Sequence, residues 1–384
     1  MVLAEGSVLS AQEFGPKLSS MTAGSLLEFH QRLGAQWIEV SGEKIPAHYG
    51  DVLAEYTAMR EAAVVLDLSF RGRLCLTGAD RQRFLHGQVT HDVNGLKAGE
   101  GCYAALVTAK GRIVSDLNLY LLADEILLDF EPGLVTKVKE RLEKFIIADD
   151  AQVVDAAPHY GLLSVQGPKA AEVLRQARTE AELPVKQMTF RTAEHSDFGQ
   201  IYLINCARLL TSGFDVFVPT EAMEAAAERL VAAAESVGGR PCGWQALEIA
   251  RVEAGIPRFG VDMDESNLAP EAGIESRAIS YSKGCYTGQE VIARIRTYGQ
   301  VARALRRLRL ADDLSQLPAR GDKLFKDSKE VGYITSAVRS PGLKASLALG
   351  YVRKETNQAG TELSLDGNGG APVRVLGEPF QAEW

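Results

Sequence analysis

Hydrophobic and polar positions follow a pattern that appears twice in the first two thirds of the chain. Residues 73–78 predict a short strand that ends at a glycine, and residues 79–85 predict the start of a helix. About 89 residues later, residues 162–167 predict another strand that ends at a glycine. Pro168 then opens a helix, where a first-turn proline is tolerated because its missing N–H would have no partner there.

The second halves of the two stretches also match, since each has a strand, a proline and a helix. In the first stretch the strand is 126–131, the proline is Pro132 and the helix is 134–147. In the second stretch the strand is 214–218, the proline is Pro219 and the helix is 221–236. Two copies of strand–helix–strand–strand–helix predict two ferredoxin-like α+β units from an internal duplication. Chance agreement between two ordinary α/β stretches is the alternative.

The carboxy-terminal part has a different pattern, with short apolar runs separated by glycines. The expected strands are 304–310, 331–337, 346–352, 361–365 and 373–376. They predict a small all-β, barrel-like domain. Before it lie a helix over 244–253 and long loops, and loops of this length in a compact chain are usually functional. Near the amino terminus we expect a helix over 24–33 and a loop over 44–50.

These patterns divide the chain into three expected domains. Residues 1–155 form the first α+β unit with an amino-terminal leader and helix, and residues 156–300 form the second unit, which carries a distinctive loop at 283–294. Residues 301–384 form the small β-barrel domain.

Composition narrows the function classes. Hydrophobic residues make up 46% and charged residues 24%, which is typical of a globular protein and not of a disordered one. The net charge of −8 argues against general binding of duplex DNA, which needs a basic face. No apolar run reaches the ~18 residues that span a membrane. The first residues carry Glu5 and no leading basic residue, so we expect no secretory signal and a cytoplasmic protein.

Cysteine and histidine spacing predicts no metal site. The five cysteines are scattered without a Cys-x-x-Cys pair, which argues against a disulfide framework and a zinc ribbon. The six histidines are dispersed, with no His-x-x-x-His pair on a helix.

The most unusual local stretch is 283–294, which begins Lys-Gly-Cys-Tyr-Thr-Gly-Gln-Glu. Its glycines, Gly284 and Gly288, allow tight turns in which the backbone can approach a ligand. Lys283 lies two residues from Cys285, and a cation there favours the thiolate. A helix that begins near Gln289 would aim its amide dipole at the loop. The alternative is that Cys285 is a small buried residue in a tight turn.

This stretch resembles the signature Lys-Gly-Cys-aromatic-x-Gly-Gln-Glu-x-x-x-Arg of the YgfZ-type folate-binding proteins. Every fixed position is present here, with Arg294 as the last. That family is related to the aminomethyltransferase, or T-protein, of glycine cleavage. The blocks that resemble this superfamily are 49–50, 55–60, 66–69, Gly78, 84–85, 90–93, 110–117, 213–215, 250–257, 331–336 and 377–380. The resemblance implies three lobes around a central cavity.

The resemblance also implies a tetrahydrofolate site. A pterin ring presents an amino group and a ring N–H side by side, which a carboxylate can accept, and its flat face stacks on aromatic rings. The glutamyl tail of folate is anionic and suits arginine. The expected ligand-binding residues are Asp116, Asp215, Arg251, Tyr103, Tyr286 and Lys283, and the expected catalytic residues are Asp116 and Cys285.

Each of these residues has a structural alternative. Asp116 is equally suited to a turn or a helix cap, and Asp215 to the surface at the start of a strand. Position 215 holds Asp where the transferases hold Glu, so its reach is shorter. Arg251 can pair with Glu253 on a helix face, and the two tyrosines can be ordinary half-buried aromatics.

Two main functions remain, and we favour the first; a one-carbon enzyme that acts on another methylated amine through the same cavity is a third possibility. The first is a folate-binding accessory protein similar to the YgfZ family, which supports iron–sulfur enzymes and tRNA modification. In that role this chain would need an iron–sulfur protein as partner, because one thiol cannot hold a cluster alone. The second is an aminomethyltransferase that moves a one-carbon unit from a lipoyl carrier protein to tetrahydrofolate. The complete signature favours the first, whereas the overall length favours the second. Whether the chain is an enzyme therefore stays open.

Overall fold

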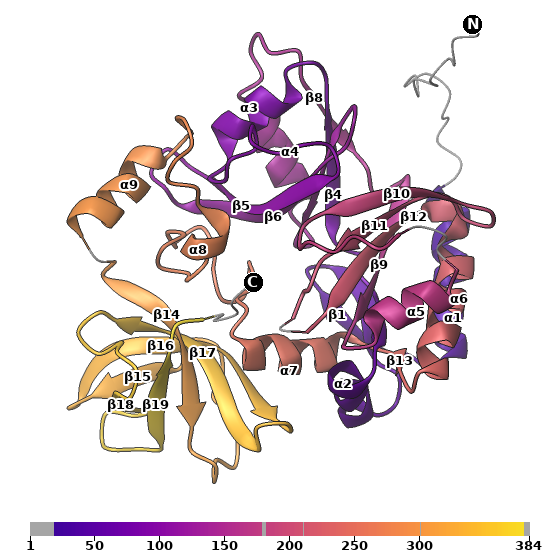
Figure 1. The fold of residues 1–384 in the computed structure, drawn as a ribbon. Helices are drawn as coiled ribbons and strands as arrows, with labels where there is room; N and C mark the ends of the chain where they lie inside the picture. Colours follow the sequence, from indigo (N-terminus) through magenta and orange to yellow (C-terminus); the bar gives the residue numbers. More distant parts are fainter. Residues whose placement is uncertain (1–18, 179–181, 210, 300, 380–384) are drawn as a thin grey trace, which may run out of the picture.

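The chain forms two β-sheets, a closed β-barrel and a small hairpin, with helices around them (Figure 1). The computed structural model describes residues 19–178, 182–209, 211–299 and 301–379. The amino-terminal segment in which we expect no secretory signal lies outside the described residues.

The first sheet has five strands in the order β5-β6-β7-β4-β8, each antiparallel to its neighbours. Its elements are β4 (Gly72–Thr77), α3 (Arg81–Gln88), β5 (Glu100–Val107), β6 (Ile113–Leu121), β7 (Ile126–Phe130), α4 (Val135–Glu143) and β8 (Gln152–Asp155). Leu85 of α3 and Leu142 of α4 are fully buried in the cluster between these helices and the sheet.

The second sheet has six strands in the order β10-β11-β12-β9-β3-β13. Its elements are β3 (Val64–Asp67), β9 (Tyr160–Gln166), α5 (Ala170–Gln176), β10 (Phe190–His195), β11 (Gly199–Asn205), β12 (Gly213–Pro219), a 3₁₀ turn (Thr220–Ala222), α6 (Met223–Ser236) and β13 (Arg240–Pro241). Strand β3 comes from the part of the sequence that we assigned to the first unit, and it pairs antiparallel with β9 and lies parallel to β13.

The two units repeat one order of elements, but the ferredoxin-like prediction is not confirmed. Each unit runs strand, helix, three strands, helix, strand, whereas a ferredoxin-like unit has only two strands between its helices. The sequence pattern did not reveal β5, β6, β10 and β11. Strand β6, for example, is at least half buried along its whole length, so it lacks the apolar–polar alternation of a half-exposed strand.

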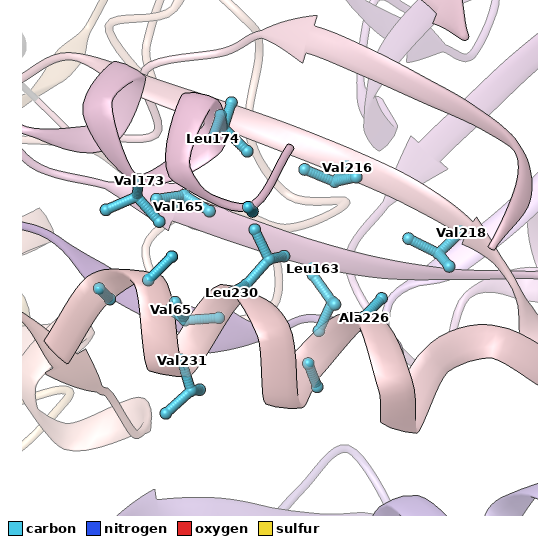
Figure 2. Packing of buried hydrophobic residues seen from close by; sticks show 14 of the residues in the cluster. Val65, Leu163, Val165, Val173, Leu174, Val216, Val218, Ala226, Leu230 and Val231 are labelled. Carbon is cyan, nitrogen blue, oxygen red and sulfur yellow. The ribbon is translucent and has the colours of Figure 1, made fainter. Parts of the chain in front are cut away.

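The two sheets pack face to face, with helices on their outer sides. Tyr120 of the first sheet meets Phe190 and Phe217 of the second edge-on, at ring-centroid distances of 6.3 and 6.0 Å. Figure 2 shows the outer layer of the second sheet, where Leu174 of α5 and Leu230 of α6 pack against strand valines. Burial of this apolar surface, at about 25 cal/mol per Å², is what fixes the two sheets and so the space between them.

The carboxy-terminal domain is a closed six-stranded barrel in the order β14-β17-β16-β15-β18-β19, drawn in yellow in Figure 1. Its strands are β14 (Arg303–Leu310), β15 (Lys323–Lys326), β16 (Lys329–Ser340), β17 (Ala345–Arg353), β18 (Glu362–Ser364) and β19 (Pro372–Gly377). The prediction of a barrel is confirmed; β15 was missed because only Leu324 of its residues is buried. Helix α7 (Trp244–Ala254) packs Val252 against the barrel residues Leu305 and Tyr351.

The remaining elements are α1 (Ser19–Arg32), β1 (Gln36–Val40), β2 (Glu43–His48), α2 (Val52–Glu61), α8 (Glu275–Ala278) and α9 (Gln289–Tyr298). The loop expected over 44–50 is wrong, since most of it forms β2. Pro46 pairs with Trp37 of β1 in a two-stranded sheet, where both strands are edges and a proline is tolerated.

Helix α9 starts at Gln289, the residue at which the sequence predicted a helix to begin. In the part of the chain described, no helix is both long and apolar enough to cross a membrane.

Candidate functional site

A cavity of about 320 Å³ lies between the two sheets, α7 and the loop that follows it. This is large enough for the two-ring head of a small-molecule ligand. The lining residues that carry the argument below are Tyr103, Asp116 and Glu131 from the first sheet, Arg208 from the loop after β11, and Glu248 and Arg251 from α7. None of the described barrel residues lines it, so the walls come from two of the three expected lobes.

The register of the first sheet explains why one end of its inner face is charged. Asn118 of β6 pairs with Asp129 of β7, and Tyr120 pairs with Leu127. The same register continued by two residues places Glu131 opposite Asp116, on the same face, because side chains alternate with period two. The Tyr120 end therefore packs against the second sheet, and the Asp116 end lines the cavity.

Asp116 is the acid best placed to meet a ligand. Its Oδ2 accepts a hydrogen bond from the Tyr103 hydroxyl at 2.9 Å, whereas its Oδ1 is shielded from solvent and has no hydrogen-bond partner among the described residues. Burial and, after it, the negative charge of nearby Glu131 raise the pKa of Asp116 to about 6, against the lowering effects of Tyr103 and Arg71. At neutral pH the side chain is thus an ionised acceptor, and its Oδ1 lacks a donor among the described residues.

Behind this wall lies a chain of alternating charges. Arg71 donates to Asp129 Oδ1 at 2.7 Å and to Glu131. Asp129 is fully buried, and its Oδ2 also accepts from Asn118 at 3.0 Å. Burial alone would raise the pKa of Asp129, but the neighbouring guanidinium groups, above all that of Arg71, hold it well below its usual range. Asp129 is therefore a permanent anion that fixes Arg71 at the cavity wall.

Arg208 carries this chain across to the second sheet. Its Nη2 donates to Asp129 Oδ2 at 2.9 Å and to Asp215 Oδ2 at 2.6 Å, and its Nε donates to both oxygens of Asp215 at 3.0 Å. Asp215 also accepts from the hydroxyl of Ser164 at 2.7 Å. Asp215 is fully buried and does not line the cavity; Arg208 stands between them.

Arg251 is on the cavity wall but is held by acids. It donates to both oxygens of Glu248, at 2.7 and 2.8 Å, and to Asp262 Oδ2 at 2.7 Å. Asp262 also accepts from the barrel residues Thr335 at 2.6 Å and Ser336 at 2.7 Å. The expected pair with Glu253 does not form, because Glu253 accepts instead from Arg60 and Tyr56. The barrel thus acts on the cavity through Asp262 and Arg251.

Two aromatic walls carry stacked guanidinium groups. Arg277 lies over the Tyr103 ring at 4.7 Å from its centroid, and Arg258 lies over the Trp244 ring at 4.3 Å. All four residues line the cavity. A flat, partly anionic ligand would find both stacking surfaces and positive charge there.

The 283–294 loop lies outside the cavity. The Lys283 ammonium is mostly buried and donates to the carbonyl oxygens of Val89 at 2.7 Å, His91 at 2.9 Å and His86. Tyr286 is buried under the Lys283 side chain in an apolar cluster. Cys285 is exposed and is not among the cavity-lining residues, so the prediction of a thiol at the cavity rim gains no support from this arrangement.

Of the residues predicted for the ligand site, the structure therefore brings Asp116, Tyr103 and Arg251 together on the cavity wall. Asp215, Lys283, Tyr286 and Cys285 lie elsewhere. Sequence reasoning missed Glu131 and Arg208. Glu131 stood at the end of a predicted strand, so a register argument between neighbouring strands would have found it. The part of the chain described holds no cluster of three or more His, Cys, Asp or Glu residues suited to a metal ion.

Two family models match the chain in succession. The GCVT N-terminal domain matches residues 26–283, and the glycine cleavage T-protein C-terminal barrel domain matches residues 303–381.

Relatives and a solved structure match over nearly the whole length. An aminomethyltransferase of Geobacillus sp. (strain WCH70) is 26% identical over 357 residues, which cover 92% of this chain and 97% of that protein. An aminomethyltransferase of Halalkalibacterium halodurans is 26% identical over 339 residues, which cover 88% of this chain and 92% of that protein. The crystal structure of the glycine cleavage system aminomethyltransferase T from Bartonella henselae matches with a TM-score of 0.82 at 24% sequence identity. The match covers 93% of this chain and 97% of that protein, which shows a shared fold.

Proposed function

The chain belongs to the glycine cleavage T-protein family, and from this premise we propose that it is an aminomethyltransferase. In this proposal it moves a one-carbon unit from an aminomethyl group on a lipoyl carrier protein to tetrahydrofolate, and ammonia is released. The names of its relatives support this function, which we ranked second from the sequence, better than the accessory role that we ranked first.

The observation that carries the proposal is the unpartnered Oδ1 of Asp116 on the cavity wall. A buried acceptor without a donor is costly, so such an atom is expected to meet a ligand N–H. The tetrahydropterin head supplies ring N–H groups and an amino group, and the cavity volume suits a two-ring head. We propose that Asp116 orients this head and stabilises positive charge that develops on its nitrogen during transfer.

The charges of the cavity support an anionic ligand. Five arginines and three acids line it, namely Arg71, Arg208, Arg251, Arg258 and Arg277 against Asp116, Glu131 and Glu248. Arg258 and Arg277, stacked on their aromatic rings, are proposed to attract the glutamyl tail. Arg258 also pairs with Glu248, at 3.0 Å, and the pairs Arg71–Glu131 and Arg251–Glu248 keep the walls rigid.

The test is ammonia release from an aminomethyl-loaded lipoyl carrier protein in the presence of tetrahydrofolate. We expect ammonia and methylenetetrahydrofolate in equal amounts, and a loss of about 10- to 100-fold in rate for Asp116→Asn, since the group acts on charge in the transition state. Asp312→Asn, which changes an exposed barrel acid, is the matched control. No tetrahydrofolate-dependent ammonia from the unaltered protein would reject the proposal.

The complete signature keeps the accessory role as a second candidate, because Cys285 is exposed and available to a partner protein. Rescue of an iron–sulfur enzyme by the unaltered protein, and its loss in Cys285→Ser, would favour that role. The relatives' names give the iron–sulfur and tRNA functions no support.

A further inference from the structure

The cavity wall holds a second buried polar atom that the proposed function does not use. His91 follows α3 and lines the cavity together with Asp116. Its Nδ1 is shielded from solvent and has no hydrogen-bond partner among the described residues, as is also true of Asp116 Oδ1. Two such atoms on one wall call for a ligand that can satisfy both.

Hydrogen bonds place the turn that holds His91 beside β5, which separates it from the β6 strand of Asp116. Thr90, next to His91, donates its N–H to the carbonyl of Ala105 at 3.0 Å, and its hydroxyl accepts from the N–H of Ala105 at 2.9 Å. Ala105 of β5 is in turn the register partner of Asp116 in β6. The two backbones are therefore about two strand spacings apart, roughly 10 Å, a span that a fused two-ring heterocycle fills with a hydrogen bond at each end.

The signature loop holds His91 in place from behind the wall. The Lys283 ammonium donates to the carbonyl oxygens of His91 itself and of Val89, at 2.9 and 2.7 Å. Charge-assisted bonds of this kind fix the backbone more firmly than neutral ones. Lys283 is thus a positioning residue for His91, which gives the signature lysine a task that needs no contact with the ligand.

His91 is suited to accept a hydrogen bond. Burial lowers its pKa from the ordinary value, against the raising effect of Asp92, so the imidazole is neutral at neutral pH. We assign its proton to Nε2, which leaves the free lone pair on the unpartnered Nδ1. Ionised Asp116 is also an acceptor. A wall with two acceptors distinguishes the two oxidation states of a pterin, because the reduced ring carries N–H donors where the oxidised ring has only lone pairs.

We infer that Nδ1 of His91 accepts a hydrogen bond from a ring N–H of the bound tetrahydropterin, and that His91 is therefore a specificity-determining residue that selects reduced over oxidised folate. This inference rests on the proposed function, since it takes folate as the ligand. To the proposed function it adds the residue whose hydrogen bond distinguishes a reduced pterin ring from an oxidised one.

The test compares the affinities of the full-length protein for tetrahydrofolate and for folic acid by calorimetry without oxygen. We expect the unaltered protein to prefer tetrahydrofolate, and His91→Phe to lose about tenfold in that preference, roughly the effect of one hydrogen bond. His91→Asn should keep the preference, because its Oδ1 occupies nearly the place of Nδ1. Cys285→Ser should match the unaltered protein.

Equal affinities in the unaltered protein, or an unchanged preference in His91→Phe, would overturn the inference while leaving folate binding intact. Absence of any binding or ammonia release would instead reject the proposed function. If His91→Phe does not fold, the imidazole nitrogen signals of the unaltered protein decide by NMR. We expect the Nδ1 resonance to shift at saturating tetrahydrofolate and to stay in place with folic acid; a resonance that stays in place with both would overturn the inference.

Discussion

Asp116→Asn should make the unliganded protein more stable even though it weakens the ligand site. The carboxylate is buried beside Glu131, and these two causes raise its pKa from 3.8 to about 6. An asparagine carries no charge to bury, and its amide oxygen can still accept from the Tyr103 hydroxyl. The exchange therefore removes an electrostatic penalty without leaving the tyrosine unpaired.

The magnitude follows from proton linkage. The folded protein keeps the Asp116 proton up to about pH 6, whereas the unfolded chain releases it near pH 4, so the stability of the wild type falls as the pH rises through this window. Two pKa units correspond to about 3 kcal/mol, and partial exposure of the side chain reduces this to about 1–3 kcal/mol. The asparagine variant escapes this loss.

The assay is thermal unfolding of the wild type and the variant without ligand, at neutral pH and near pH 3, below the ordinary pKa of an aspartate. We expect the variant to melt a few degrees higher at neutral pH, and the two curves to coincide in acid, where Asp116 is protonated in both states. Asp312→Asn, with its exposed carboxylate, should melt like the wild type at both pH values. A variant that is less stable than the wild type at neutral pH would refute the reasoning about the buried charge.

The other predictions concern the charges around the cavity and the free thiols. Glu131→Gln removes the neighbouring charge that raises the pKa of Asp116, so the pH below which tetrahydrofolate affinity falls should move lower; an unmoved profile measured by calorimetry would contradict the coupling. Arg208→Met removes the guanidinium shared by two buried aspartates, of which Asp215 keeps only neutral donors, and should cost about 3–5 kcal/mol in urea unfolding. Arg208→Lys should fall in between, and a loss below about 1 kcal/mol would show the pairs to be unimportant. A thiol reagent should label one cysteine in the native protein, Cys285, since the other four are buried and burial raises the pKa of each; rapid labelling of a second thiol would contradict the packing.

The sequence predicted those elements whose pattern depends on one buried face. The barrel strands β14 and β16 have a solvent side, and α6 and α7 have an apolar stripe, so periodicity located them within a few residues. Strand β17 is buried along almost its whole length and was located from its apolar run between glycines. Helices cover one face of β6 and the second sheet covers its opposite face. Because both faces are buried, the sequence of β6 does not alternate between apolar and polar residues. The place of β3 in the second sheet follows from pairing across about 100 positions, which no local pattern records.

For the site, the sequence pointed to the right acid but not to its surroundings. Asp116 was predicted from a resemblance, and the strand that holds it also explains its neighbour Glu131. Asp215 was predicted on the same grounds, yet the structure places it behind Arg208. Arg208 lies in a loop with no periodicity, and its two aspartates come from different sheets. Only the tertiary fold brings such a chain of charges together.

The most direct test is a calorimetric titration of the full-length protein with tetrahydrofolate in the absence of oxygen. The account predicts one saturable site per chain, with an affinity at least tenfold lower in Asp116→Asn because a charge-assisted hydrogen bond is lost, and unchanged in Asp312→Asn. No saturable heat at millimolar tetrahydrofolate, or equal affinity in the wild type and Asp116→Asn, would contradict the claim that this cavity binds the pterin through Asp116.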